Sequence, residues 1–223
     1  MKTLLKNGTL ITASDTFQSD ILIEDEKIAR LGLNLEVDSD QRIDAAGKLI
    51  LPGGVDPHVH LDLPMFNTVS SDDHYTGHKA AAFGGTTTVM DFVVLESPSP
   101  SGRGQGEGSF QYSVDLWMKK AEKAAIDYSF HMNLTQFNDR IAKEIPSLRG
   151  MGIQTLKVFT AYNGRLRIDD GSIFRAMQIA RDNGMLVMAH CENGDVIETL
   201  VGQALAAGHT SPEWHALTRP GWG

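Results

Sequence analysis

The stretch that most constrains this chain is residues 52–64, PGGVDPHVHLDLP, which places His58 and His60 two positions apart after the apolar run 49–51. If that run is a strand, residues two apart point to the same side, and both imidazoles face one point at its C-terminal end. Functional groups of β/α scaffolds gather at that end of the strands, where a metal ion can be held. A turn carrying two surface histidines explains the same pair, so the rest of the chain has to decide.

Composition narrows the class of protein. The chain has 223 residues and a formal net charge of −8, and it contains no cluster of basic residues, so neither nucleic acid nor an anionic membrane is expected as a partner. The single cysteine, Cys191, rules out an internal disulfide and fits a reducing compartment. No signal-peptide pattern and no apolar run of the roughly 20 residues that span a bilayer is present. We expect a soluble, cytoplasmic protein.

Residues 1–50 predict short antiparallel strands that form part of a small β-sandwich. Asn7-Gly8, between two apolar pairs, is typical of a tight hairpin turn. The charged segment 24–27 predicts a second turn, and residues 42–44 a further short strand. This part contains no candidate catalytic or metal-binding residue.

From about residue 48 strands alternate with helices, which predicts a parallel sheet with crossover helices. The expected strands are 48–55, 86–95, 128–134, 155–160 and 185–190, and the expected helices are 72–83, 114–125, 139–148, 171–183 and 195–207. Residues 97–109, rich in Ser, Pro and Gly, predict an exposed loop. Five β/α units indicate the first part of a (β/α)8 TIM-type barrel over residues 51–223, with residues 1–50 as a separate domain. The tail 209–223 predicts no sixth strand.

Two further residues lie where the histidine pair would need them. Lys157 stands among apolar residues of the fourth expected strand, and His190 ends the fifth. Lys157 either reaches a solvated barrel end or pairs with a carboxylate, or else desolvation makes it neutral and reactive. A neutral lysine can take up carbon dioxide and become a carboxylate that bridges two metal ions. The combination with the histidines is far more specific than any single member.

The remaining candidates are weaker. His74 and His78, one helical turn apart, have the spacing of metal ligands, but a solvated helix face is the favoured interpretation. His131 suits a satisfied core histidine, and His209 and His215 suit the surface. Cys191 is expected to be a packing residue.

Tyr162, just past the fourth strand, is either a rim tyrosine or a donor to a developing oxyanion. Two divalent metal ions bridged by a carboxylate suit the hydrolysis of an amide or similar C–N bond.

With these residues the chain resembles the cyclic amidohydrolases of the amidohydrolase superfamily, and dihydropyrimidinases and D-hydantoinases most. The resemblance rests on GGVDPHVHLDLPM, GGTTTVMDF, LKVFTAY and MAHCENGDVI. Dihydroorotases usually carry an Arg after the histidine pair, where Leu61-Asp62 stands here. Allantoinases tend to differ both after the histidine pair and after the second expected strand, but allantoin remains an alternative substrate.

The resemblance implies roles for individual residues. His58 and His60 match ligands of the more buried metal, Lys157 matches the carboxylated lysine that bridges two metals, usually zinc, and His190 matches a ligand of the second. Tyr162 matches the tyrosine that hydrogen-bonds the substrate carbonyl. Residues that match positions shaping the substrate pocket are Met65, Phe159 and Leu166. The implied reaction, part of pyrimidine catabolism, opens dihydrouracil, dihydrothymine or hydantoin rings to N-carbamoyl amino acids.

Family members are about twice as long and are commonly homotetramers. The part without a counterpart here holds three barrel strands, the strands that complete the sandwich, a further His ligand and an Asp that shuttles the proton. We therefore expect an N-terminal half with little hydrolase activity of its own. The rival hypothesis is a non-catalytic fragment or interaction protein that uses the open sheet edge.

Overall fold

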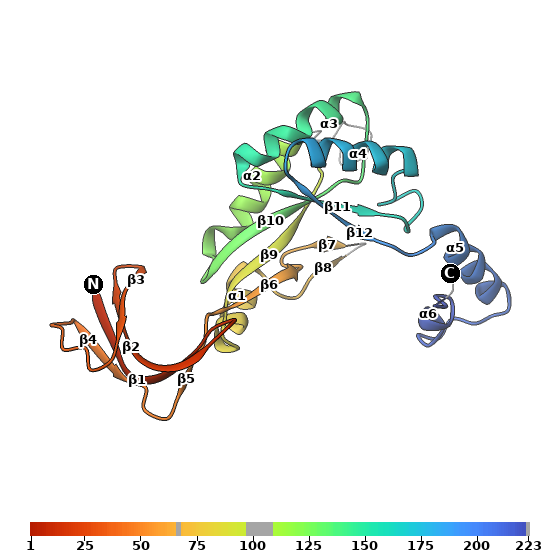
Figure 1. Cartoon of the computed structure of the whole chain (residues 1–223). Coiled ribbons are helices and arrows are strands. Elements are labelled where there is room, and N and C mark those ends of the chain that lie inside the picture. Colours follow the sequence, from red (N-terminus) through yellow and green to blue (C-terminus); the bar gives the residue numbers. More distant parts are fainter. Residues whose placement is uncertain (66–67, 97–108, 222–223) are drawn as a thin grey trace. The chain divides into compact units, whose positions relative to one another are not determined.

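A computed structural model describes residues 1–65, 68–96 and 109–221 of the chain (Figure 1). Its residues form two compact units, Met1–Gly54 and Val55–Gly223. Most of the expected loop 97–109 lies outside the described residues; only Ser109, at the start of a helix, is seen.

The first unit is one five-stranded sheet of β1 (Lys2–Ile11), β2 (Thr16–Glu24), β3 (Lys27–Gly32), β4 (Gln41–Asp44) and β5 (Leu49–Ile50). The first three strands form an antiparallel meander, but β4 and β5 both run parallel to β1. The expectation of purely antiparallel strands was therefore wrong for β4 and β5. The segment between β3 and β4 is long enough to return the chain in the direction of β1, which a tight hairpin cannot do.

The hairpin predicted at Asn7-Gly8 does not exist. Strand β1 runs straight through this dipeptide, and its pairing with β2 shifts register between Leu5 and Gly8. Asn7 takes a left-handed φ of 62°, and its backbone N–H donates to Asp20 Oδ1 at 2.7 Å. The same left-handed conformation that suits a turn here makes a bulge, because Asp20 satisfies the N–H that leaves the ladder.

The second unit contains a five-stranded sheet whose order is β12-β11-β10-β9-β6. The strands are β6 (Gly54–Val59), β9 (Thr86–Val94), β10 (Asp127–Asn133), β11 (Thr155–Phe159) and β12 (Leu186–His190), and the pairs from β9 to β12 are parallel. Neighbours in the sheet follow one another along the chain, as in successive units of a β/α barrel. The short strands β7 (Pro64–Met65) and β8 (Thr68–Val69) pair with each other.

The strand predicted over 48–55 was wrong in its bounds. Leu51, Pro52 and Gly53 interrupt it, so Leu49–Ile50 pairs with β1 in the first unit while β6 starts at Gly54. A proline has no N–H for a ladder, and glycines allow the chain to change direction. As a result His58 lies inside β6 and His60 directly after it.

Helices follow the strands as expected, with differences at their ends. They are α1 (His74–Phe83), α2 (Phe110–Lys120), α3 (Asp139–Glu144), α4 (Asp170–Asp182), α5 (Gly194–Ala206) and α6 (Trp214–Leu217). The first has Asp73 as N-cap in a complete capping box with Thr76. The second starts earlier than predicted because Ser109 caps it. The third changes at Ile145 to a 3-10 helix with Pro146 in its first turn. The described part of the tail contains α6 and no strand.

The core of this unit lies on the helix side of the sheet. Val93, Met132 and Leu156, from three adjacent strands, pack with helix residues such as Trp117 and Ile141. Because side chains alternate along a strand, the neighbours of these residues, such as Phe92 and Lys157, point to the opposite face. That face carries the candidate site.

Candidate metal centre

The two histidines of the predicted ligand pair lie together against one phenyl ring. The imidazole centroids of His58 and His60 are 5.2 Å apart at 87°, and they lie 4.5 and 5.0 Å from the ring of Phe92 on β9. Partial burial lowers the pKa of both rings, and the Lys157 cation lowers that of His58 further. Neutral imidazole is the form that binds a metal ion.

Lys157 is buried on the same face of the sheet. Its side chain on β11 is 8% exposed, and its Nζ lies 5.6 Å from the Phe92 ring centroid and 5.5 Å from that of Phe159. Within the described ranges it forms no ion pair with a carboxylate. Burial lowers the pKa of Lys157, opposed by the nearby Cys191. The burial of Lys157 and the lowered pKa agree with the interpretation of a desolvated lysine, and its reactivity stays a prediction.

His190 ends β12 directly beside Phe159, its register partner on β11. Its ring centroid lies 6.1 Å from that of Phe159 and 5.2 Å from that of Tyr162. Its Nε2 is 2.5 Å from Glu192 Oε2. One nitrogen of this predicted ligand is thus already engaged by a carboxylate.

Tyr162 lies in the loop that follows β11 and has a left-handed φ of 65°. Its backbone carbonyl accepts hydrogen bonds from the N–H groups of Arg165 and Leu166, at 3.1 and 3.0 Å. A non-glycine residue in this conformation costs energy that the turn has to offset, and such strain concentrates at functional sites. The phenol is 40% exposed, so it is free to meet a ligand.

The structure brings most of the predicted site residues together. Lys157 stands between the histidine pair and the group of His190, Tyr162 and Phe159, and Leu166 is joined to Tyr162 through the backbone. Met65 is exposed at the end of β7, a separate segment. Among the described residues, no three His, Cys, Asp or Glu side chains are close enough to hold a metal ion. The donor set fits a metal ion in type, because two imidazoles lie side by side, and carboxylation of Lys157 would add an oxygen ligand.

Of the histidines outside this site, His74 and His78 differ from the expectation, whereas His131 agrees with it. His74 and His78 were expected on a solvated helix face, which is wrong: both are fully buried beneath α1, beside Tyr128. The apolar residues of this short helix do not form a clear stripe, so periodicity gave no signal for its buried face. His131 is a satisfied core histidine, contacting the Pro57 carbonyl at 2.9 Å and the Thr155 hydroxyl.

Cys191 is exposed, so its expected packing role was wrong as well. It follows the last residue of β12, where the chain leaves the sheet. Sequence reasoning also missed Glu192, whose spacing of two from His190 was the available signal.

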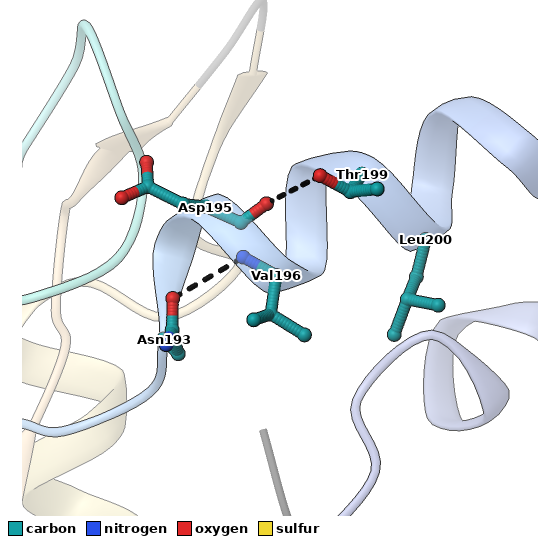
Figure 2. A pocket seen from close by; sticks show the side chains of 5 residues that line it. All are labelled: Asn193, Asp195, Val196, Thr199 and Leu200. Atoms are coloured by element: carbon teal, nitrogen blue, oxygen red, sulfur yellow. Dashed lines mark hydrogen bonds between the residues drawn. The ribbon is translucent and has the colours of Figure 1, made fainter.

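A shallow pocket lies along the first turns of α5, lined by Asn193, Asp195, Val196, Thr199 and Leu200 (Figure 2). The Asn193 side chain caps the helix by accepting from the Val196 N–H at 3.2 Å, and the Thr199 hydroxyl donates to the Asp195 carbonyl at 2.8 Å. These polar groups are used within the helix itself. None of the predicted metal ligands lines this pocket.

Comparison with known proteins identifies the class. Residues 49–215 match the model of the Amidohydrolase family, and the chain belongs to that family. The chain is 45% identical to a D-hydantoinase of Geobacillus stearothermophilus, covering 99% of this chain and 45% of that protein. It is 36% identical to a dihydropyrimidinase of Dictyostelium discoideum, covering 97% and 42%. The chain thus spans less than half the length of these relatives.

Solved structures agree with the fold. A crystal structure of a D-hydantoinase superposes with a TM-score of 0.91 at 45% identity, over 99% of this chain and 46% of that one. A dihydropyrimidinase of Brevibacillus agri gives the same values. The predicted incomplete (β/α)8 barrel is confirmed, and the part expected to belong to a small β-sandwich is a five-stranded sheet. No helix among the described residues is long and apolar enough to cross a membrane.

Proposed function

We propose that this chain supplies the N-terminal part of the active site of a metal-dependent hydrolase that opens cyclic amides. The observation that carries the proposal is the burial of Lys157, without an ion-pair partner among the described residues, between the His58/His60 pair and His190. An ammonium group buried without a counter-ion is costly, so burial favours the neutral amine. Conversion to a carbamate would turn it into the anion that two neighbouring cations require.

Each predicted site residue would have its own role in metal binding or in catalysis. His58 and His60 would hold one divalent ion, His190 a second, and carboxylated Lys157 both; zinc suits this nitrogen and oxygen set. When bound, such ions supply an activated water and polarise a carbonyl. The Tyr162 phenol would donate a hydrogen bond to the substrate oxygen as negative charge develops on it.

The names of the relatives support the proposed substrate class. Relatives are named D-hydantoinase and dihydropyrimidinase, so hydantoins and dihydropyrimidines are the proposed substrates, with N-carbamoyl amino acids as products. Phe159 and Leu166, close to Tyr162, would contact the ring substituent, and Met65 would approach it from β7. The reaction adds water across a ring C–N bond and leaves the nitrogen protonated.

Metal binding tests the site most directly. Zinc affinity of the purified chain would be measured by competition with a chromophoric chelator, in the presence of bicarbonate, for the original chain and for His58→Ala. We expect His58→Ala to weaken binding by at least about 10-fold, and His215→Ala, which removes an exposed histidine of α6, to leave it unchanged. Equal effects of the two variants would contradict the site.

Ring opening tests the reaction. Hydrolysis of dihydrouracil and hydantoin would be followed in the same samples. Turnover that His58→Ala abolishes supports the proposed chemistry. Tight zinc binding with hydrolysis of neither ring in a full-length protein containing this chain would contradict the substrate class.

A further inference from the structure

Three charged or polar side chains, from the end of β12, the loop after it and the tail beyond α6, contact one another in a row that starts at a proposed metal ligand. His190 Nε2 lies 2.5 Å from Glu192 Oε2, and Glu192 Oε1 lies 3.6 Å from Arg219 Nε. The side chains of His190, Glu192 and Arg219 are 32%, 30% and 25% exposed, so the contacts are partly shielded from water. An ionised carboxylate can only accept, which makes Nε2 the protonated nitrogen of the ring.

The backbone around this carboxylate is fastened to the end of the neighbouring strand. The Thr160 hydroxyl lies 2.9 Å from the His190 carbonyl and 2.7 Å from that of Glu192, and its single proton is shared between them. The Thr160 N–H also donates to the His190 carbonyl at 3.0 Å. Both ends of the His190–Glu192 segment are therefore tied to one residue.

Gly194 closes this segment against the same loop. Its N–H donates to the Thr160 carbonyl at 3.3 Å, and a Cβ at this position would lie 3.0 Å from Ala161 Cα and 3.1 Å from the Thr160 oxygen. So close an approach of two backbones leaves the segment little freedom. The carboxylate is thus held on the imidazole by the fold around it.

We propose that Glu192 is a positioning residue for His190: it holds the ring as the Nε2–H tautomer, leaves Nδ1 as the nitrogen open to a metal ion, and is itself steadied by Arg219. The metal part of this inference rests on the proposed function, while the tautomer part does not. Histidines that bind metals commonly donate their second N–H to a carboxylate, which fixes the ring and strengthens the ligand. Arg219, beyond α6, would thereby contribute to a site formed at strand ends.

The tautomer can be read without any metal. Long-range 15N–1H correlation spectra of the metal-free chain at about pH 8 would show the protonation of each imidazole, and His190→Gln would assign the His190 signals. We expect Nε2–H for His190 in the original chain and a mixture of tautomers in Glu192→Gln. The matched control is Glu198→Gln, which removes an exposed carboxylate of α5 and should leave the spectrum of His190 unchanged.

The outcomes are decisive in both directions. Nδ1–H in the original chain, or an unchanged His190 spectrum in Glu192→Gln with backbone amide shifts preserved elsewhere, would overturn the proposal. If metal binds as proposed, Glu192→Ala should lower the affinity for the second ion about 10–100-fold and Glu192→Gln less. Loss of zinc binding in His58→Ala is read separately, so failure of the metal site and failure of the positioning role are distinguished.

Discussion

His74 Nε2 lies 3.4 Å from Asp91 Oδ2 beneath α1, and the two side chains are 0% and 1% exposed. Neither atom has a hydrogen bond of good geometry among the described residues. His78 completes this buried group, with its ring centroid 5.3 Å from that of His74. Buried polar groups without partners are expensive, and His78 is the member of this group whose pKa burial lowers.

Folding stability should fall in mild acid through His78. Burial, followed by the neighbouring His74, lowers the pKa of His78 below its usual 6.5. The unfolded chain therefore binds a proton at a higher pH than the folded chain. The contribution of His78 to stability is complete above about pH 6.5 and is lost as the pH falls from there toward the folded pKa. Urea unfolding at pH 8 and 5.5 should show a smaller difference for His78→Gln than for the original chain.

Two leucines on adjacent strands should contribute very different amounts to the free energy of unfolding. Leu156 on β11 is 0% exposed in the core beneath the helices, whereas Leu186 on β12 is 61% exposed. Leu156→Ala should cost about 2–5 kcal/mol of unfolding free energy, and Leu186→Ala less than about 0.5 kcal/mol. Urea denaturation of the two variants checks this. Equal losses would mean that the two faces of the sheet are misassigned.

Two glycines of α5 offer a matched pair. A Cβ at Gly202 meets nothing within 4 Å, whereas one at Gly194 meets the backbone of the loop after β11. Gly202→Ala should stabilise by about 0.5–1 kcal/mol through helix propensity. Gly194→Ala should destabilise by about 1–3 kcal/mol through overpacking. Thermal unfolding shows whether each substitution stabilises or destabilises the chain. Stabilisation by both substitutions would contradict the close approach of two backbones at Gly194.

Lys157 should take up carbon dioxide. Because burial lowers the pKa of Lys157, its amine is neutral at a lower pH than an exposed lysine and can attack carbon dioxide. In 13C-bicarbonate with zinc we expect a carbamate carbon signal that is lost in Lys157→Gln and kept in Lys79→Gln, an exposed lysine of α1. A signal that survives Lys157→Gln belongs to another amine.

Much of the architecture follows from local patterns in the sequence. Strands and helices alternate where expected after residue 54, and Asp73 caps its helix because the aspartate and Thr76 lie within one turn of each other. The positions of His58, His60 and His190 near strand ends, and of Lys157 inside its strand, could also be predicted, because the ends of parallel strands meet at one edge. Such features depend on residues close together in the chain.

Tertiary contacts decided the rest. Asn7 forms a bulge because Asp20, on another strand, accepts its N–H. The run 49–55 divides between two sheets because β1 pairs with only Leu49 and Ile50. His74 and His78 are buried because the sheet covers the face of α1 that carries them, and Glu192 meets His190 because Thr160 folds the segment back. Local propensity cannot determine which distant partner satisfies a polar group. The sequence by itself determined the helices, the strands and the residue types of the site. The packing of distant segments determined which of these residues contact one another.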